Sequence, residues 1–418
     1  MSVPVMASKS SSLQLGHNIS FMSEPQTHPT QSSSMVLVIG GGVTGLITAW
    51  VLLDRGYQVT IVSKQWASYD KEQRLTSQIA GALWEYPPAV CGQHTDPTSL
   101  IRSKEWCMTA YQIWEAIAAD PALAKMAGVQ MRKSIFFFPK SLVDTPTQLL
   151  KLGEIDGSGA HEVRRDVGLI EEMGVDLSCG AVDAYELLVP IIDTDKCMAW
   201  LMNLVQHKGA CFVTETIRGD IFSEERSLLR RFNAGAIVNA SGLASKELAS
   251  DPSCYPLRGA LLRFINDGKD FPKITTAMSI GADASLDNEI MFLVPRNDDI
   301  LIAGGIAQRD EWYLDLTLDS PVVQRMRARC EAFLPCLKNA RLDPEYPLAQ
   351  GLRPGREKNI RVERDCRTSG GRQSRIVHSY GHGGSGWSLS FGCAEEVVAL
   401  VEDVLQERDD LSELRCRL

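Results

Sequence analysis

Long hydrophobic runs are missing from this sequence, and several other familiar signals are missing with them. No run of 18 or more apolar residues occurs, so we expect no membrane-spanning helix. The 11 cysteines are scattered, odd in number and never spaced C-x-x-C, which argues against a disulfide framework or a zinc site and favours reduced, mostly buried thiols. The seven histidines are dispersed too, with only His378 and His382 near each other, so we predict no metal site.

The charge balance and the first 34 residues exclude further classes of protein. A net charge of −9 is a poor match for a phosphate backbone, so nucleic acid is not an expected partner. Residues 1–34 hold one basic residue, Lys9, and one acidic residue, Glu24, and they lack the basic start and apolar run of a signal peptide as well as the arginines of a mitochondrial transit peptide. We interpret residues 1–34 as a disordered tail. The 418-residue chain, 44% hydrophobic, is long enough for two or three domains.

Ordered structure is predicted from residue 35, in a strand–helix–strand unit. Residues 35–39 are a continuous apolar run of strand length, a helical pattern follows to about Arg55, and residues 58–63 read as a second strand. The first turn carries the glycine fingerprint Gly40-x-Gly42-x-x-Gly45. The first glycine allows a tight turn, the second lets backbone approach a pyrophosphate, and the third lets the helix pack on the strand. A helix N-terminus also offers free N–H groups to phosphates, so the unit predicts a dinucleotide site.

The end of the second strand departs from that fingerprint. An Asp or Glu for the ribose hydroxyls is usual there, but this chain has Ser63-Lys64-Gln65. Ribose binding is therefore expected to use a hydroxyl or a backbone group. Lys64 is read either as a contact for a 2′-phosphate, as in NADP, or as a solvated lysine at a strand end.

The rest of the chain alternates between helical and strand patterns. Residues 75–87 are rich in small residues and suit a backbone that runs close to a flat ligand. Helices are predicted over residues 101–130 and 193–208, strands over 134–140, 210–217, 234–240 and from 257 to 265, and a hairpin over 291–306. Helix–strand patterns at both ends with strands between them imply interleaved domains.

Near the C-terminus, residues 379–387 read SYGHGGSGW, with four glycines just before a helical pattern. Glycine destabilises regular structure, so the cluster is either a surface turn or a close approach of backbone to a ligand. A helix N-terminus at this point would stabilise an anion.

Five stretches carry a family likeness: VIGGGVTGL, IAGALWEYP, IVNASGL, GLRPGREKNIRVERD and IVHSYGHGGSGWSLSFGCAEEV. Together they resemble the D-amino-acid oxidase family of FAD-dependent oxidoreductases, as a fungal-type member, from about residue 35 to the last residue. The resemblance implies an α/β fold: a Rossmann-like FAD-binding domain (35–100, 205–255 and 346–418) interleaved with an antiparallel-sheet α+β substrate domain (101–204 and 256–345).

The resemblance also implies a set of cofactor contacts. The glycine turn would cradle the pyrophosphate, residues 76–83 would line the flavin and its phosphates, the backbone of Ile217 would meet the adenine, and the C-terminal glycines would bring backbone against the flavin ring. The residues expected to bind FAD are Gly40, Gly42, Val43, Gly45, Ser63, Thr76, Ser77, Ala82, Leu83, Ile217, Ser241, Gly242, Gly383, Gly386, Trp387 and Ser388.

Arg353, Gly384 and Phe292 are the expected catalytic positions. Arg353 in GLRPGR matches the arginine that clamps the substrate carboxylate through two parallel hydrogen bonds. A structural arginine paired with a nearby acid is the alternative, and it suits Arg356 equally well. The family's tyrosine before the hairpin falls on Phe292, and a second one falls near Asn288 or on Ala307, so two hydroxyls for the substrate are absent.

The resemblance implies hydride transfer from the carbon of a C–N bond to FAD, with an imine and H2O2 as products and dioxygen as acceptor. Three interpretations stay open: an oxidase of a D-amino acid or related amine, a tailoring oxidoreductase of secondary metabolism with a larger and less polar substrate, and a non-catalytic flavin-binding protein. The chain ends Cys416-Arg417-Leu418, a small–basic–leucine pattern of the peroxisomal type, so we expect peroxisomal residence and a peroxisomal import receptor as a partner.

Overall fold

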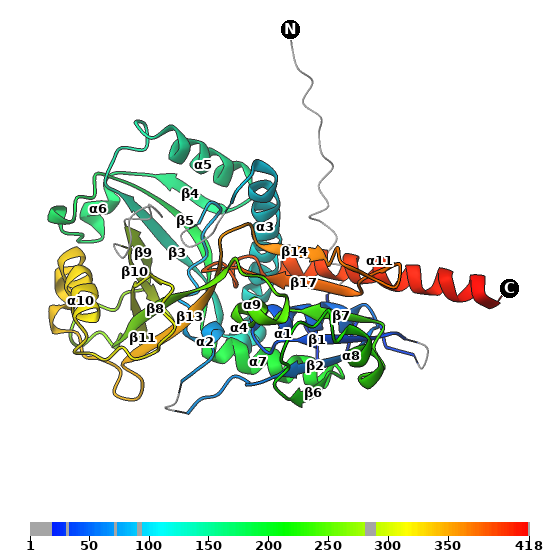
Figure 1. Cartoon of the computed structure of the whole chain (residues 1–418). Helices are drawn as coiled ribbons and strands as arrows, with labels where there is room; N and C mark the ends of the chain where they lie inside the picture. The colour runs from blue at the N-terminus through cyan, green and yellow to red at the C-terminus, as the bar shows by residue number, and fades with distance from the viewer. Residues whose placement is uncertain (1–18, 31–32, 71–72, 90–93, 281–289, 417–418) are drawn as a thin grey trace, which may run out of the picture.

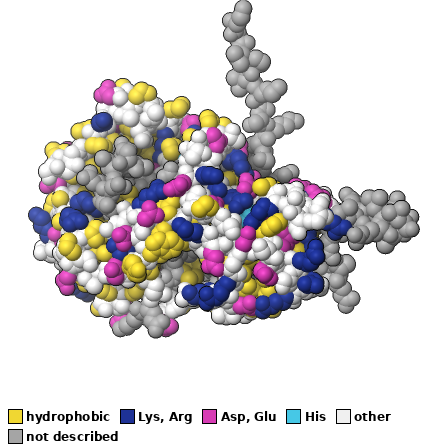
Figure 2. All heavy atoms as spheres, in the orientation of Figure 1, with side chains coloured by type: hydrophobic (Ala, Val, Ile, Leu, Met, Phe, Trp, Pro, Cys, Tyr) yellow, Lys and Arg dark blue, Asp and Glu magenta, His cyan; other side chains and the backbone are white. Residues whose placement is uncertain are grey.

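The computed structural model describes residues 19–30, 33–70, 73–89, 94–280 and 290–416, without the side chains of 408–416. Within these residues two large sheets lie side by side, and helices cover their faces (Figure 1). No helix of the described residues is long and apolar enough to cross a membrane. On the face in Figure 2 positive and negative side chains are interspersed.

The six-stranded sheet draws its strands from the first part, the middle and the last part of the described chain. Its order is β14 (Arg361–Arg364), β17 (Ile376–Tyr380), β7 (Ala236–Asn239), β1 (Met35–Ile39), β2 (Gln58–Ser63) and β6 (Cys211–Thr214). β17, β7, β1, β2 and β6 run parallel. Strand β1 is buried on both faces, because Val36 and Val38 belong to one apolar cluster and Leu37 and Ile39 to another, as expected for a parallel strand between two layers of helices.

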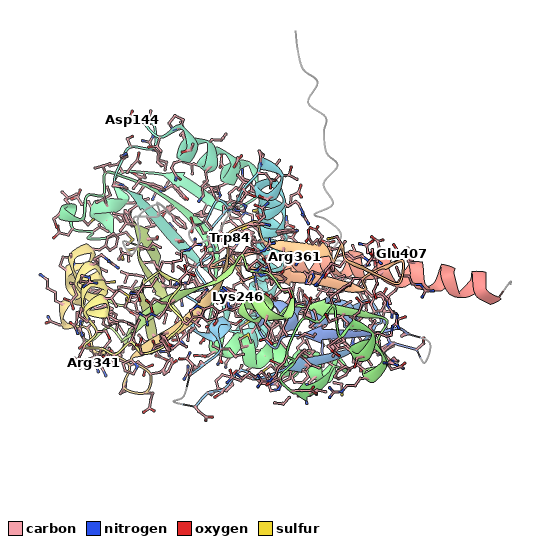
Figure 3. The ribbon with its side chains drawn as sticks, in the orientation of Figure 1. Trp84, Asp144, Lys246, Arg341, Arg361 and Glu407 are labelled. Atoms are coloured by element: carbon pink, nitrogen blue, oxygen red, sulfur yellow. The ribbon has the colours of Figure 1, made fainter. Side chains whose placement is uncertain are left out.

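The helices around this sheet explain those two clusters. α1 (Val43–Asp54), α3 (Pro97–Ala119), α7 (Thr194–His207) and α11 (Ser390–Cys416) pack together on one side. α8 (Glu225–Arg231) and α9 (Ser245–Leu248) supply Leu228, Leu229 and Leu248 on the other. Glu407 of α11, labelled in Figure 3, pairs with Arg364 of the edge strand β14 at 2.8 Å.

The nine-stranded sheet has the order β12 (Gln308–Arg309), β8 (Cys254–Ile265), β11 (Ile300–Gly304), β10 (Met291–Pro295), β9 (Ala277–Ile280), β3 (Val129–Phe138), β5 (Asp183–Ile192) and β4 (His161–Arg165), and β13 (Leu348–Arg356) also pairs with β8. α10 (Pro321–Phe333) covers one face with Val323, Met326 and Phe333. The remaining elements are connections: α2 (Thr76–Ile79), α4 (Pro121–Ala127), α5 (Pro146–Gly157), α6 (Leu169–Glu172), η3 (Leu177–Cys179), η4 (Gly242–Ala244), η5 (Pro335–Asn339) and the hairpin of β15 (Thr368–Ser369) and β16 (Arg372–Gln373).

Several predicted elements are confirmed. β1 and β2 have the predicted bounds, α7 starts and ends one residue inside the predicted range, and β10 and β11 form the predicted antiparallel hairpin, with Phe292 opposite Gly304. The helical range predicted over 101–130 is confirmed as far as residue 127, but it consists of two helices, α3 and α4, and its last residues belong to β3. Asp120 accepts hydrogen bonds from the N–H groups of Ala122 and Leu123 and starts a new helix at Pro121, and Gly128, in the left-handed region at φ +68°, ends it before β3.

The tail prediction is also wrong for residues 19–30. The carboxylate of Asp54, at the end of α1, accepts hydrogen bonds from the backbone N–H groups of Ser20 (2.8 Å) and Gln26 (3.0 Å). Lys208 donates to the same carboxylate at 2.7 Å and to the carbonyl of Glu24 at 2.9 Å. A buried ion pair therefore ties this segment to the first helix, whereas residues 1–18 lie outside the described part of the chain.

One domain assignment needs correction as well. Residues 346–418 were all placed with the FAD-binding domain, but β13 pairs with β8 from Leu348–Leu262 to Arg356–Cys254 and so continues the nine-stranded sheet. The other domain bounds stay predictions.

Candidate active site

The turn between β1 and α1 is shaped by two different uses of glycine. Gly40 has φ +127°, and a Cβ there would lie 2.7 Å from the carbonyl carbon of Ala240 at the end of β7. A Cβ on Gly45 would overlap the carbonyl of Gly40, so this glycine lets the helix pack on the turn. Gly42 differs, because a Cβ there would meet only Ser77 Oγ, at 3.1 Å. The free side of Gly42 therefore faces the cavity described next.

A cavity of about 600 Å³ lies at the carboxyl ends of the parallel strands and continues along β13. Its size is within the range of cofactor sites. Of the predicted site residues, those that line it are Gly40, Gly42, Val43, Ser63, Thr76, Ser77, Ile217, Ser241, Gly242, Arg353, Gly383, Gly384, Gly386 and Trp387. Segments separated by more than 300 residues in sequence thus line one cavity.

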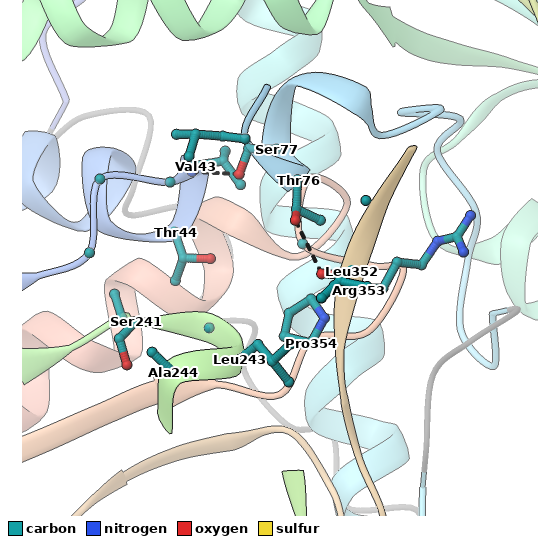
Figure 4. Close-up of a pocket in the computed structure, with 18 of the residues that line it drawn as sticks. Val43, Thr44, Thr76, Ser77, Ser241, Leu243, Ala244, Leu352, Arg353 and Pro354 are labelled. Carbon is teal, nitrogen blue, oxygen red and sulfur yellow. Dashed lines mark hydrogen bonds between the residues drawn. The ribbon is translucent and has the colours of Figure 1, made fainter. Parts of the chain in front are cut away.

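Helix α2 joins three parts of this wall (Figure 4). The hydroxyl of Ser77 accepts a hydrogen bond from the N–H of Val43 at 3.1 Å, and the hydroxyl of Thr76 donates to the carbonyl of Leu352 at 3.1 Å. Trp387 Nε1 donates to the carbonyl of Ser77 at 2.9 Å. The glycine turn, β13 and the C-terminal glycine segment are therefore held in fixed relation around the cavity.

The C-terminal glycines lie where a flat ligand could approach backbone. Gly383 has φ +54°, and its N–H donates to the carbonyl of Pro354 at 2.9 Å. A Cβ on Gly386 would meet only Val43, at 3.9 Å. α11 begins at Ser390, so a turn separates these glycines from the helix. Gly42, the N-cap of α1, supplies no side-chain hydrogen bond, and Ser77 engages only the N–H of Val43, so the next N–H groups of the helix start are left for an anion.

Five predicted residues do not line the cavity: Gly45, Ala82, Leu83, Phe292 and Ser388. Gly45 packs within the turn, Leu83 bridges to Ile191 of β5, and Ser388 is buried. The ring of Phe292 lies among three glycines, since a Cβ on Gly81, Gly304 or Gly305 would come within 2.8–2.9 Å of it. Phe292 thus stands behind Gly81, which does line the cavity. Asn288, the alternative tyrosine position, lies outside the described residues.

Arg353 and Arg356, which the sequence could not distinguish, have different surroundings. Arg356 pairs with Asp251 at 2.8 Å and does not line the cavity. Arg353 lines it and donates from Nη1 to the carbonyl of Ile306 at 2.9 Å. Among the described residues no carboxylate pairs with Arg353. Arg356 is therefore the structural arginine, and the Arg353 guanidinium has N–H groups left for an anionic ligand.

Several residues that line the cavity were not predicted from the sequence. Thr44, Glu215, Thr216, Gly259, Gly351 and His382 all line the cavity. Burial lowers the pKa of His382 to about 4, so its ring is neutral near pH 7, and its Nε2 has no hydrogen-bond partner among the described residues. Thr44, Thr216 and His382 are next to predicted residues, and Glu215 is two positions from Ile217, which was the available signal. Gly259 carries no local signal, because its role depends on pairing with β13. Within the described chain no group of three His, Cys, Asp or Glu is placed to hold a metal.

Residues 35–400 match the family model described as FAD dependent oxidoreductase (DAO). The chain is 30% identical to a D-amino-acid oxidase of Rubrobacter xylanophilus over 366 residues, covering 87% of this chain and 94% of the relative, and 26% identical to one of Dugesia ryukyuensis, covering 88% and 98%. The structure of a glycine oxidase from Bacillus cereus superposes with a TM-score of 0.64 at 17% identity, covering 89% of this chain and 95% of that one.

These matches support the fold, the cofactor and the family, but not the fungal-type assignment, since the relatives come from a bacterium and an animal. The glycine cradle, the N-terminus of α1 and the cavity size all fit FAD. Arg417 and Leu418 lie outside the described residues, so the peroxisomal address stays a prediction. The chain belongs to the DAO family of FAD-dependent oxidoreductases.

Proposed function

We propose that this enzyme is an oxidase that removes hydride from the nitrogen-bearing carbon of a D-amino acid or a related amine. The carbon loses a hydride and the nitrogen a proton, which gives an imine, and water then hydrolyses the imine to a carbonyl compound and free amine or ammonia. Bound FAD supplies the two-electron acceptor, and dioxygen takes the two electrons and two protons to become H2O2.

The observation that carries this proposal is the position of Arg353. Arg353 lines the same cavity as the glycine cradle, and among the described residues no carboxylate pairs with its guanidinium. A planar guanidinium fixes a carboxylate in angle as well as position. The hydrogen bond to the Ile306 carbonyl uses part of the guanidinium and sets its orientation, which limits the poses open to a bound acid.

The other wall residues orient and enclose the substrate. The backbone of Gly384 lines the cavity together with Gly383 and Gly386, where no side chain blocks a flat ring. Leu261 and Leu314 line it as well and keep part of the wall apolar. An amine that enters unprotonated needs no base from the protein, so the tasks of these residues are orientation and exclusion of water.

A second candidate is a tailoring oxidoreductase with a larger, less polar substrate. Phe292 favours it, because a phenyl ring packed among glycines stands where the family resemblance implies a hydroxyl. Both candidates keep the same cofactor and cavity and differ only in the substrate.

Anaerobic mixing with a panel of D-amino acids and other amines tests the proposal, with bleaching of the flavin absorbance as readout and peroxide release measured in air. Rapid bleaching and peroxide with at least one D-amino acid is expected. Bleaching only with bulky apolar amines supports the second candidate, and no bleaching with any amine overturns both.

A further inference from the structure

The end of β2 lacks an acidic residue for the ribose of the cofactor. In dinucleotide-binding folds an acid there accepts hydrogen bonds from the ribose hydroxyls of the adenosine. Here Ser63 stands in its place, and its hydroxyl is already engaged: it accepts from the N–H of Gly41 at 3.1 Å and donates to the carbonyl of Gln65 at 2.6 Å. Lys64 and Gln65 line the cavity but carry no carboxylate.

The neighbouring strand supplies a carboxylate at the same edge of the sheet. β6 runs parallel to β2 with Thr214 opposite Ser63, and the N–H of Glu215 donates to the carbonyl of Ser63 at 3.0 Å. Trp66 Nε1 donates to the hydroxyl of Thr214 at 2.8 Å and fixes the end of β6. Glu215 lines the same cavity as the glycine turn and Ile217.

The carboxylate of Glu215 is held in one orientation and in its ionised form. Arg231 of α8 makes a two-point ion pair with it, Nη1 to Oε1 at 2.7 Å and Nη2 to Oε2. The hydrogen bond from Arg231 lowers the pKa of Glu215 below its usual range. Each carboxylate oxygen keeps a second acceptor site, and the side chain retains 29% of its exposure.

We propose that Glu215 accepts hydrogen bonds from the ribose hydroxyls of the adenosine half of FAD and so replaces the acid that β2 lacks. Arg231 is then a positioning residue that aims the carboxylate. A carboxylate that accepts from the ribose hydroxyls leaves no place for a 2′-phosphate, which favours the interpretation of Lys64 as a solvated lysine. The proposal depends on FAD as cofactor and not on the substrate.

The test compares ligands that do or do not contain the adenosine half. The full-length protein, freed of flavin, is titrated with FAD and with FMN, and Kd is measured from the change in flavin fluorescence. Glu215→Ala should raise Kd for FAD on the order of tenfold, because a charge-assisted hydrogen bond is lost, and should leave Kd for FMN unchanged. Glu224→Ala removes an exposed glutamate at the start of α8 and should change neither value.

A second titration separates hydrogen bonding from a structural effect. FAD built with 2′-deoxyadenosine should bind the wild-type protein more weakly than FAD does, but should bind Glu215→Ala as well as FAD does, since the partner is already missing. Glu215→Gln, which keeps the shape, should fall between wild type and Glu215→Ala. Equal weakening of FMN and FAD by Glu215→Ala, or an unchanged Kd for FAD, overturns the proposal.

Discussion

The guanidinium of Arg353 lies directly against the backbone of Gly259. The two residues sit on the paired strands β13 and β8, and a Cβ built on Gly259 would lie 2.5 Å from Cζ of Arg353. The absence of a side chain at residue 259 therefore determines where the cation of residue 353 can lie. Any larger residue at 259 must move the guanidinium or the strand.

Arg353→Lys should lower kcat/KM for a carboxylate-bearing substrate at least about tenfold, since a buried charge contact is worth about 2–5 kcal/mol and lysine lacks the fork geometry. Gly259→Ala should produce a similar fall while the arginine is still present. Steady-state kinetics with the best substrate of the panel provides the measurement.

Arg356→Lys is the matched control, because that residue pairs with Asp251 outside the cavity. Arg356→Lys should lower the melting temperature and should leave kcat/KM close to the wild-type value. If Arg353→Lys and wild type share the same kcat/KM, then Arg353 does not orient the substrate.

Gly42→Val should give colourless protein. Within the protein a Cβ at this position meets only Ser77 Oγ, so the chain can fold around the larger residue, but the side chain would extend into the space for the pyrophosphate. The flavin absorbance per protein after purification gives the result. Gly153→Ala on α5, where a Cβ meets nothing within 4 Å, should stay yellow. A yellow Gly42→Val protein with full flavin content would show that this turn does not hold the cofactor.

Local sequence signals predicted the parts of the site that depend on neighbours in the chain. Gly40, Gly42 and Gly45 lie close together in sequence, and the strand–helix–strand pattern around them predicted that they form the turn between β1 and α1. Contacts between distant segments left no such signal. The anchoring of residues 19–30 depends on the ion pair between Asp54 and Lys208. These residues are far apart in sequence, so no local pattern predicts that they meet. Asp120-Pro121 is a local signal for a helix start, an N-cap acid followed by proline, and it marks the boundary between α3 and α4.

His382 should make the protein sensitive to mild acid. Burial lowers its pKa to about 4, whereas the unfolded value is about 6.5. Between these values the unfolded chain binds a proton and the folded protein does not, so stability falls as the pH drops below about 6.5. By pH 5 this one group should reduce the free energy of unfolding by about 2 kcal/mol.

The His382→Asn variant isolates that contribution. Its melting temperature should fall less between pH 7 and pH 5 than that of the wild type, measured by circular dichroism with FAD present. His207→Asn, at the exposed end of α7, is the control and should keep the wild-type acid sensitivity. Identical falls in wild type and His382→Asn would show that the buried ring is not the sensitive group.

Substrate preference should depend on Phe292. Its ring does not line the cavity but packs against Gly81, which does, and Leu261 lines the cavity as well, so the wall in front of the ring is apolar. An extra carboxylate or hydroxyl buried there without a partner would cost about 1–3 kcal/mol. We therefore expect kcat/KM to rise from D-aspartate through D-alanine to D-phenylalanine.

Phe292→Tyr adds one hydroxyl to the ring that packs against Gly81 and should shift this order towards the polar substrates, because it places an O–H donor next to the apolar wall. Leu314→Met, an apolar exchange elsewhere in the wall, should keep the wild-type order. A wild type that prefers D-aspartate contradicts the polarity argument. If the wild type oxidises none of the three amino acids but does oxidise bulky apolar amines, the tailoring oxidoreductase becomes the better account. In that case Phe292→Tyr should lower the rate with those amines, because the new hydroxyl would have no hydrogen-bond partner beside them.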